Sequence, residues 1–443
     1  MSRPTYLIPP FDGVASDLMK EDAYWIRDQV QKHNKWFEES IPMIASENLM
    51  SPLAKEMMIS DFHDRYAEGL PGKRYYNGNI YVDQVEIKCL ELAQRIFKCQ
   101  FADVRPISGT VANMAALMAL IQPGETMTCT SLDHGAHIST AKFGAVGFRG
   151  VNTATYPFDT HDMVIDVDGA AKLIREVKPK VVQFGLSVFL FPAPVKELAD
   201  VAAEVGAPVW YDGAHVLGLI AGGKFQDPLH EGANVLTAST HKTFPGPNHG
   251  IVLGHNLSEE LGKKLNSAVF PGVTSSHHLH AMAALAVTMA EWEIYGEKYA
   301  AQVCKNAKAL GQALHELGIE VLCSHKGFTE SHTIAVNVAP YGGGAEAANL
   351  MEKANMIANK NMLPGDKSSV KPSGIRLGAQ EMTRVGMRES EMKEVASLIH
   401  RVVVKKESPE VVKKDTMALK RNFTKVRYCL HEGEEAYAYH KLV

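Results

Sequence analysis

The chain has 443 residues, of which 46% are hydrophobic, and this length predicts two or three domains around a substantial core. Its net charge of −4 gives no electrostatic reason to expect nucleic acid or an acidic membrane as a partner. The six cysteines form no Cys-x-x-Cys pair, which argues against a zinc ribbon or a disulfide framework. With no secretory signal and no 18-residue apolar run, the sequence predicts a cytoplasmic protein without membrane contact.

Predicted elements begin with an amphipathic N-terminal arm over residues 14–40, where Trp25, Ile26 and Val30 lie at helical spacing. Apolar runs then alternate with helical stretches, the pattern of an α/β fold. Strands are predicted at 126–130, 181–186, 209–211, 235–238 and 251–253, and helices at 111–121 and 195–205.

A second pattern follows a helix predicted at 280–295, which we expect to end near Gly296. Residues 300–317 predict a helix and residues 333–338 a strand of a smaller α+β unit. The predicted domains are therefore an N-terminal helical arm at 1–60, a large domain at 61–293 and a small domain at 294–443. The charged stretch 405–421 predicts a solvated helix, with an interface as the alternative.

One lysine stands out because residues 239–247 (Ser-Thr-His-Lys-Thr-Phe-Pro-Gly-Pro) place Lys242 among hydroxyls, an imidazole and a rigid turn. Its amine can bond to an aldehyde once its pKa falls from about 10.4. Asp212 closes the apolar run 209–211, so its carboxylate should emerge at a strand end, where ligands of open α/β sheets bind. A covalent lysine with an aspartate facing a ring nitrogen indicates pyridoxal phosphate chemistry. The alternatives are a solvated lysine and an aspartate that forms a turn or a helix cap.

Two further motifs could contact a cofactor. Ser108, Gly109 and Thr110 precede a predicted helix, where they form either a phosphate site or an ordinary cap. His134 and His137 could present an imidazole to an aromatic cofactor. Neither this pair nor the histidines of segment 277–280 have a matching carboxylate or cysteine set, so the sequence predicts no metal site.

Two motifs could act on a substrate. Arg376 lies between apolar neighbours in segment 374–378 and needs an anion there, which is either a substrate carboxylate or an internal salt bridge. The loop at 66–76 holds an acid, phenols and bases around two glycines and a proline. This composition suits proton transfer at a site entrance, and an ordinary loop is the alternative.

Taken together, five blocks resemble serine hydroxymethyltransferase, a fold-type-I pyridoxal phosphate enzyme. They are residues 44–48 (Ile-Ala-Ser-Glu-Asn), 66–76, 212–215, 240–243 and 373–376. The tail and the 270–280 loop are most similar to the archaeal-type branch. The resemblance implies a mostly parallel seven-stranded sheet in the large domain and a smaller C-terminal α+β domain.

The resemblance also implies residue roles. Lys242 would bind the cofactor covalently, Asp212 would face the pyridine nitrogen, and His137 would stack on the ring. The cofactor would further contact Ser108, Gly109, Thr110, Ser187, His215, Thr240 and His241. Ser46, Tyr76 and Arg376 would bind the amino acid, Glu68 and Asn361 the pterin, and the catalytic set would be Lys242, Asp212, His215, Glu68, Tyr66 and Tyr76.

Glu68, Tyr66 and Tyr76 would reach in from a neighbouring subunit, so the resemblance implies a homodimer at least. Ser275 and Ser276 replace a glycine pair that approaches the partner's phosphate in the common bacterial pattern, and serine can still donate to phosphate. Tetrahydrofolate, a modified folate or no pterin at all therefore stay open. The alternative enzymes are a pterin-independent threonine or allo-threonine aldolase, a transaldolase and an α-methylserine-type enzyme. A catalytically silent binding protein is the alternative from another class.

Overall fold

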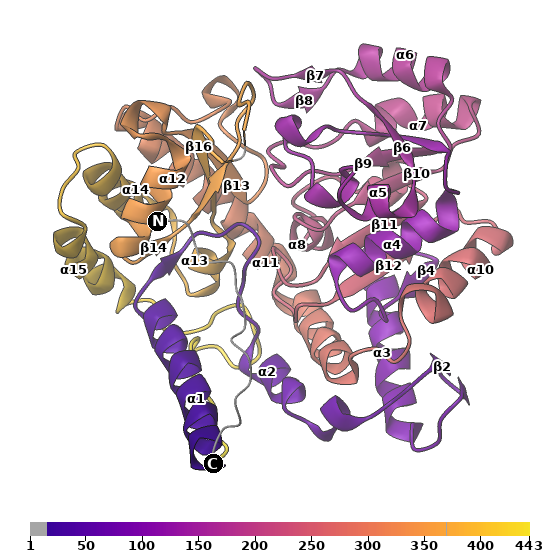
Figure 1. Ribbon diagram of the computed structural model, residues 1–443, viewed down its shortest axis with the longest axis horizontal. Coiled ribbons are helices and arrows are strands. Elements are labelled where there is room, and N and C mark those ends of the chain that lie inside the picture. Colours follow the sequence, from indigo (N-terminus) through magenta and orange to yellow (C-terminus); the bar gives the residue numbers. More distant parts are fainter. Residues whose placement is uncertain (1–15, 369) are drawn as a thin grey trace.

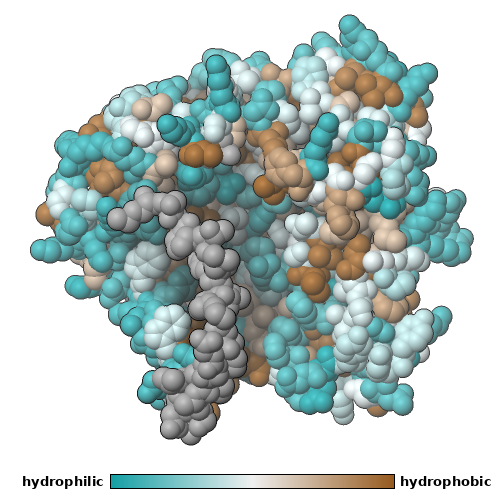
Figure 2. Space-filling model, in the orientation of Figure 1, coloured by the Kyte–Doolittle hydropathy of each residue, from teal (hydrophilic) through white to brown (hydrophobic). Residues whose placement is uncertain are grey.

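A computed structural model describes residues 16–368 and 370–443 of the chain. Figure 1 shows two parts side by side, a larger one built on a central sheet and a smaller C-terminal one, with the long helix α11 (Leu279–Glu316) between them. In the same orientation, the visible face of the molecule is mostly hydrophilic, with scattered hydrophobic patches (Figure 2). No helix within these described residues is long and apolar enough to cross a membrane. The arm helix α1 (Ser16–Glu38) forms as predicted, although Trp25 and Ile26 are 63% and 58% exposed.

The larger part contains a sheet of seven strands. Their spatial order is β4 (Phe101–Asp103), β12 (Gly250–Gly254), β11 (Val235–Ser239), β10 (Val209–Asp212), β9 (Val181–Phe184), β5 (Thr126–Cys129) and β6 (Asn152–Thr155). The run from β11 to β6 is parallel, and β12 is antiparallel to both of its neighbours. The predicted α/β fold with a mostly parallel sheet is confirmed.

The sheet is the middle layer of the larger part because successive side chains of a strand point to opposite faces. In β10, Val209 and Tyr211 belong to one buried core, whereas Trp210 belongs to another. The first core includes residues of α3 (Ile80–Phe97), α6 (Val167–Val177), α7 (Val195–Glu204), α8 (Leu217–Ala221), α9 (Pro228–Glu231) and α11. The second includes residues of α4 (Gly109–Leu120), α5 (Ala145–Arg149) and α10 (Glu259–Ser267).

The smaller part has its own core. The smaller part contains a three-stranded sheet in the order β13 (Thr333–Asn337), β16 (Gly374–Gly378) and β15 (Asn359–Asn361). Its helices are α12 (Gly343–Lys353), α13 (Gln380–Arg384), α14 (Glu389–Val403) and α15 (Pro409–Lys420). A second, two-stranded sheet pairs β1 (Ile41–Pro42) with β14 (Met356–Ile357). Through β1, the segment after α1 joins this C-terminal part, because Ile41 pairs with Met356 and is fully buried.

The predicted end of a helix near Gly296 is wrong, because α11 runs unbroken from Leu279 to Glu316. Gly296 does not end the helix but leaves room for the Trp292 side chain, because a Cβ atom at this position would lie 2.4 Å from Nε1 of Trp292. Helix α11 contributes Val303 to the core of the larger part and Ala307 to that of the smaller part. The domain boundaries at residues 60 and 293 stay predictions.

Candidate active site

A cavity of about 300 Å³ lies where the carboxyl ends of β10 and β11 meet the N-terminus of α4. This is the edge of an open α/β sheet at which ligands bind. Its lining contains nine of the predicted site residues, namely Ser46, Ser108, Gly109, Thr110, His137, Asp212, His215, His241 and Lys242. Asn113, Leu186, Ala214, Ser239 and Asn248 complete the lining.

Lys242 follows β11 and is 8% exposed. Burial lowers the pKa of its amine to about 8, the carboxylate of Asp212 opposes this shift, and the charge of Arg376 adds to it. The side-chain amide of Asn48 donates to the Lys242 carbonyl at 2.6 Å and so fixes the backbone at this position. The lysine is therefore a buried amine of which about a tenth is neutral at pH 7, far more than for a lysine in water.

Asp212 ends β10 and is 6% exposed. One of its oxygens accepts from Asn113 Nδ2 at 2.8 Å and the other from the backbone N–H of Ala214 at 3.0 Å. Asn113 is in turn fixed by Thr237, whose hydroxyl donates to Asn113 Oδ1 at 2.6 Å. Sequence reasoning missed Asn113, although it lies four residues after Gly109 and hence on the same helix face.

Helix α4 begins at the cavity. The Ser108 hydroxyl accepts from the N–H of Val111 at 3.2 Å, so Ser108 is the helix cap that the sequence allowed as an alternative. Gly109 approaches β11 so closely that a Cβ atom there would lie 2.9 Å from the Cβ of Ser239. The hydroxyl of Ser239 is buried without a hydrogen-bond partner in the described structure. The cavity thus combines free N–H groups of a helix N-terminus with an unused hydroxyl, which suits an anion.

Three histidines line the cavity and are held neutral. Burial lowers the pKa of His137, brings that of His241 to about 4, and holds that of His215 well below its ordinary value. The ring of His215 stacks on His332, with ring centroids 5.7 Å apart. Neutral imidazoles offer flat faces and hydrogen bonds to a ligand without adding positive charge.

Arg376 lies in β16 and is 8% exposed. Its Nη1 donates to the carbonyl oxygen of Ser187 at 2.9 Å, while its Nε has no partner. Burial lowers the pKa of Arg376 to about 10. Among the ion pairs within residues 16–368 and 370–443, none involves Arg376. The alternative of an internal salt bridge is therefore wrong for the described chain, and the guanidinium keeps free donors for an anion.

Arg376 is not part of the cavity lining, and neither are three other predicted contacts. Ser187 presents its carbonyl oxygen to Arg376, as described above. The Thr240 hydroxyl donates to the Pro247 carbonyl at 2.7 Å, so it is used within the loop. Asn361 ends β15, and its side-chain amide donates to the Met362 carbonyl at 2.6 Å. Their contacts with ligands stay predictions.

A second group of predicted residues forms a cluster outside the cavity lining. The Tyr66 hydroxyl donates to Glu68 Oε1 at 3.0 Å and lies 3.0 Å from the Ser275 hydroxyl, which also donates to Glu68. The rings of Tyr66 and Tyr76 meet edge to face, with centroids 4.8 Å apart. Ser276 accepts from the N–H of Ala67 at 3.2 Å. Tyr66 and Tyr76 are 46% and 48% exposed, so the described chain presents this cluster at its surface.

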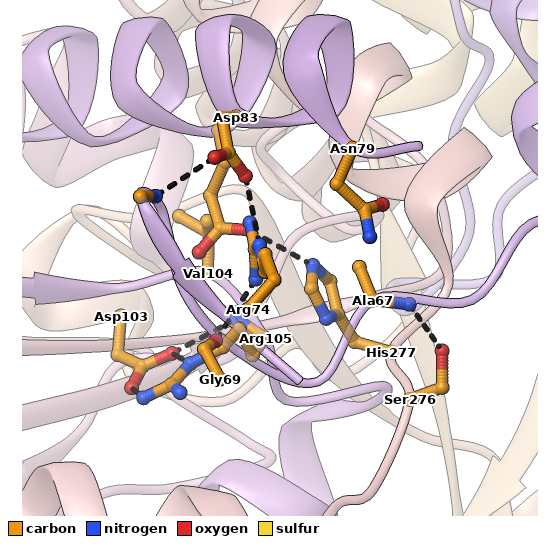
Figure 3. A network of polar contacts seen from close by, with 12 residues as sticks. Ala67, Gly69, Arg74, Asn79, Asp83, Asp103, Val104, Arg105, Ser276 and His277 are labelled. Atoms are coloured by element: carbon orange, nitrogen blue, oxygen red, sulfur yellow. Dashed lines mark hydrogen bonds and ion pairs between the residues drawn. The ribbon is translucent and has the colours of Figure 1, made fainter. Parts of the chain in front are cut away.

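A buried ion network, drawn in Figure 3, lies beside the contact between Ala67 and Ser276. Arg74 is the last residue of the hairpin formed by β2 (Gly69–Leu70) and β3 (Lys73–Arg74), and its side chain is 4% exposed. It donates to Asp83 at 2.8 Å, to Glu86 at 2.5 Å and to the Gly69 carbonyl at 2.8 Å. His277 lies 3.3 Å from Glu86. The network therefore ties the 66–76 loop and the 274–278 segment to helix α3.

Comparison with known proteins agrees with this geometry. The family model of serine hydroxymethyltransferase matches residues 19–399. Proteins named serine hydroxymethyltransferase are similar over nearly their whole length: that of Thermoplasma volcanium is 55% identical over 96% of this chain and 99% of its own, and that of Methanopyrus kandleri is 51% identical over 95% and 98%. That of Thermococcus kodakarensis is 53% identical over 91% and 95%. The chain belongs to the serine hydroxymethyltransferase family.

Proposed function

We propose that this enzyme interconverts serine and glycine with pyridoxal phosphate as its cofactor and passes the hydroxymethyl carbon to a reduced pterin. The observation that carries the proposal is a buried Lys242 with a lowered pKa in one cavity with Asp212 and the N-terminus of α4. Family membership supports the transferase chemistry.

The cavity fits pyridoxal phosphate on its own geometry. The N–H groups at the start of α4 and the unpartnered hydroxyl of Ser239 suit the phosphate. Asp212, held by Asn113, suits a protonated ring nitrogen. His137 offers an imidazole face to the ring. The volume of the cavity, about 300 Å³, lies at the lower end of the range for ligand pockets.

When bound, pyridoxal phosphate supplies an electron sink for the charge that develops at the substrate Cα. Lys242 would hold the cofactor covalently through its amine, and burial keeps part of that amine neutral near pH 7. Asp212 would hold the ring nitrogen in its protonated form through a charge-assisted hydrogen bond. Arg376 and Ser46 hold the substrate carboxylate, because Arg376 has an unpartnered Nε and no acidic partner in the described chain.

We assign proton transfer to Glu68, with Tyr66 and Tyr76 beside it, acting in the cavity of a neighbouring subunit. This cluster lies outside the lining of its own chain's cavity, which supports a shared site. An exposed apolar groove of about 620 Å³ between α2 (Pro52–Met58), α3 and α11 supports burial against a second copy. We also propose that Asn361 contacts the pterin and that the enzyme acts in the cytoplasm, where its six unpaired cysteines suit a reducing medium.

The test compares serine cleavage with tetrahydrofolate, with tetrahydromethanopterin and without a pterin. We expect one reduced pterin to stimulate cleavage of serine and to leave cleavage of allo-threonine unchanged, because the aldehyde from allo-threonine departs without an acceptor. Glu68→Gln should abolish the pterin-dependent reaction and spare the aldol reaction. Absence of pterin stimulation, or an equal loss of both activities in Glu68→Gln, would contradict the transferase and favour an aldolase or transaldolase.

A further inference from the structure

Two loops from the two parts of the molecule bring together three side chains that can bind metal. His161 and Asp162 lie between β7 (Phe158–Asp159) and β8 (Val164–Ile165) in the larger part. His325 lies in the short 3-10 helix Ser324–Lys326 of the smaller part. In the part of the chain that the structure describes, these residues form the only group of three or more His, Cys, Asp or Glu ligand atoms that all lie within 4.8 Å of one another.

The ligand atoms converge on one oxygen. Nδ1 of His161 lies 2.9 Å and Nε2 of His325 lies 2.8 Å from Oδ1 of Asp162. Ligand atoms at the corners of a tetrahedral zinc site lie about 3.4 Å apart, since zinc bonds measure about 2.0–2.1 Å. If the two nitrogen–oxygen distances widened by roughly half an ångström, the ion would therefore fit between the three ligand atoms.

The backbone around these ligands is already fixed. Oδ1 of Asp159 accepts from the backbone N–H groups of His161 and Asp162 at 2.9 and 3.0 Å. Across the gap between the two loops, Cys323 Sγ donates to the His161 carbonyl at 3.6 Å. The His161 and His325 rings are stacked with centroids 4.2 Å apart. An ion would therefore meet two loops whose backbone contacts are already made, which limits the conformational entropy lost on binding.

We propose that His161, Asp162 and His325 form a site for a divalent transition metal ion of the zinc class, which joins the β7–β8 hairpin to the smaller part. Two imidazoles and one carboxylate are the protein ligands of an open zinc site, and water completes the tetrahedron at these exposed side chains. Each facing imidazole nitrogen must give up its proton, which a neutral ring does by changing tautomer. The site is independent of the proposed function.

Lys326 tunes this site. Its Nζ lies 3.5 Å from Oδ2 of Asp162, donates to the Asp162 carbonyl at 3.2 Å, and stands over the Phe191 ring at 4.1 Å. The ammonium thus occupies the other side of the carboxylate and leaves Oδ1 to the metal. Its charge opposes a cation, so removal of the charge should strengthen metal binding.

The test titrates ZnCl₂ into the EDTA-treated holoenzyme by calorimetry. The wild-type protein should bind one more equivalent of Zn²⁺ than the double variant His161→Ala/His325→Ala. Each single variant should weaken the binding of this additional Zn²⁺ at least about tenfold. Lys326→Gln should tighten it. His230→Ala is the matched control, because His230 is also an exposed histidine with Nδ1 2.9 Å from a carboxylate, that of Asp227.

Three results would overturn the proposal. The first is equal stoichiometry and affinity in wild type and the double variant. The second is an equal loss of zinc binding in His230→Ala. The third is equally tight binding of Ca²⁺, which would assign an oxygen site instead of a mixed imidazole and carboxylate site. Activity is not needed as a readout, so failure here is separate from failure of the proposed enzymatic function.

Discussion

At the scale of one residue, Lys242 is the group that we propose holds the cofactor, and burial brings its pKa to about 8. Only the neutral amine attacks an aldehyde, so the rate at which apoenzyme takes up pyridoxal phosphate should rise as the pH passes through about 8. Stopped-flow absorbance of the bound cofactor measures that rate. Borohydride reduction and peptide mapping should then find the pyridoxyl group on Lys242. A label on another lysine, or a rise in rate only near pH 10, would contradict this assignment.

Arg376 is a buried cation that forms no ion pair in the described chain. In Arg376→Lys we expect serine to bind about 2 kcal/mol more weakly, roughly a thirtyfold loss, because an ammonium cannot reproduce a bidentate contact with a carboxylate. Spectral titration of the holoenzyme measures this affinity, and cofactor binding should stay nearly constant. Arg401→Lys is the control, since Arg401 pairs with Glu407 at a partly exposed position. Unchanged serine affinity would assign Arg376 a structural role.

At the scale of an element, the β2–β3 hairpin and its loop depend on Arg74, whose partners Asp83 and Glu86 are 17% and 2% exposed. Burial alone would raise the pKa of Glu86, but His277 and Arg74 hold it below its ordinary value. Arg74→Met removes the arginine from the buried Glu86 carboxylate and leaves only His277 beside it, so this change should lower the free energy of unfolding by about 3–5 kcal/mol.

The matched control is Arg65→Met on the same segment. Arg65 pairs with Asp61 at the surface, where the two side chains are 55% and 70% exposed, so its loss should lower the free energy of unfolding far less than the loss of Arg74. Urea unfolding of both variants measures the difference. Similar free energies for the two variants would mean that the buried network does not stabilise the hairpin.

At the scale of the whole molecule, the active site that we propose two subunits share would make two inactive variants complementary. Lys242→Ala and Glu68→Gln chains that reassociate at random should recover roughly a quarter of wild-type activity, because each mixed dimer contains one site with both native residues. The control mixes Lys242→Ala with Asp212→Asn, whose altered residues line one cavity of the same chain, and should recover none. No recovery in the first mixture would mean that each chain completes its own site.

Local sequence patterns determined much of the fold. The predicted strands at 181–186 and 209–211 and the helix at 111–121 formed because hydrophobic periodicity reports which face of an element is buried. The polar edge strand β6 escaped prediction, because none of its side chains is buried and its sequence lacks an apolar signal. Lys242 and Asp212 were recognisable because each lies in a short motif beside a strand end, where Asp212 closes β10 and Lys242 follows the last residue of β11 by three positions.

Contacts between distant segments were decided only by the tertiary structure. Asn113 meets Asp212 across 99 residues, and His325 meets Asp162 across 163. Gly296 looked like a helix end because its packing partner, the Trp292 indole, gives no signal in the sequence pattern. Likewise, the sequence left open whether Arg376 forms an internal salt bridge, and only its neighbours in the structure excluded that alternative for the described chain. Periodicity encodes the burial of each element, whereas the pairing of polar side chains depends on how the finished elements pack together.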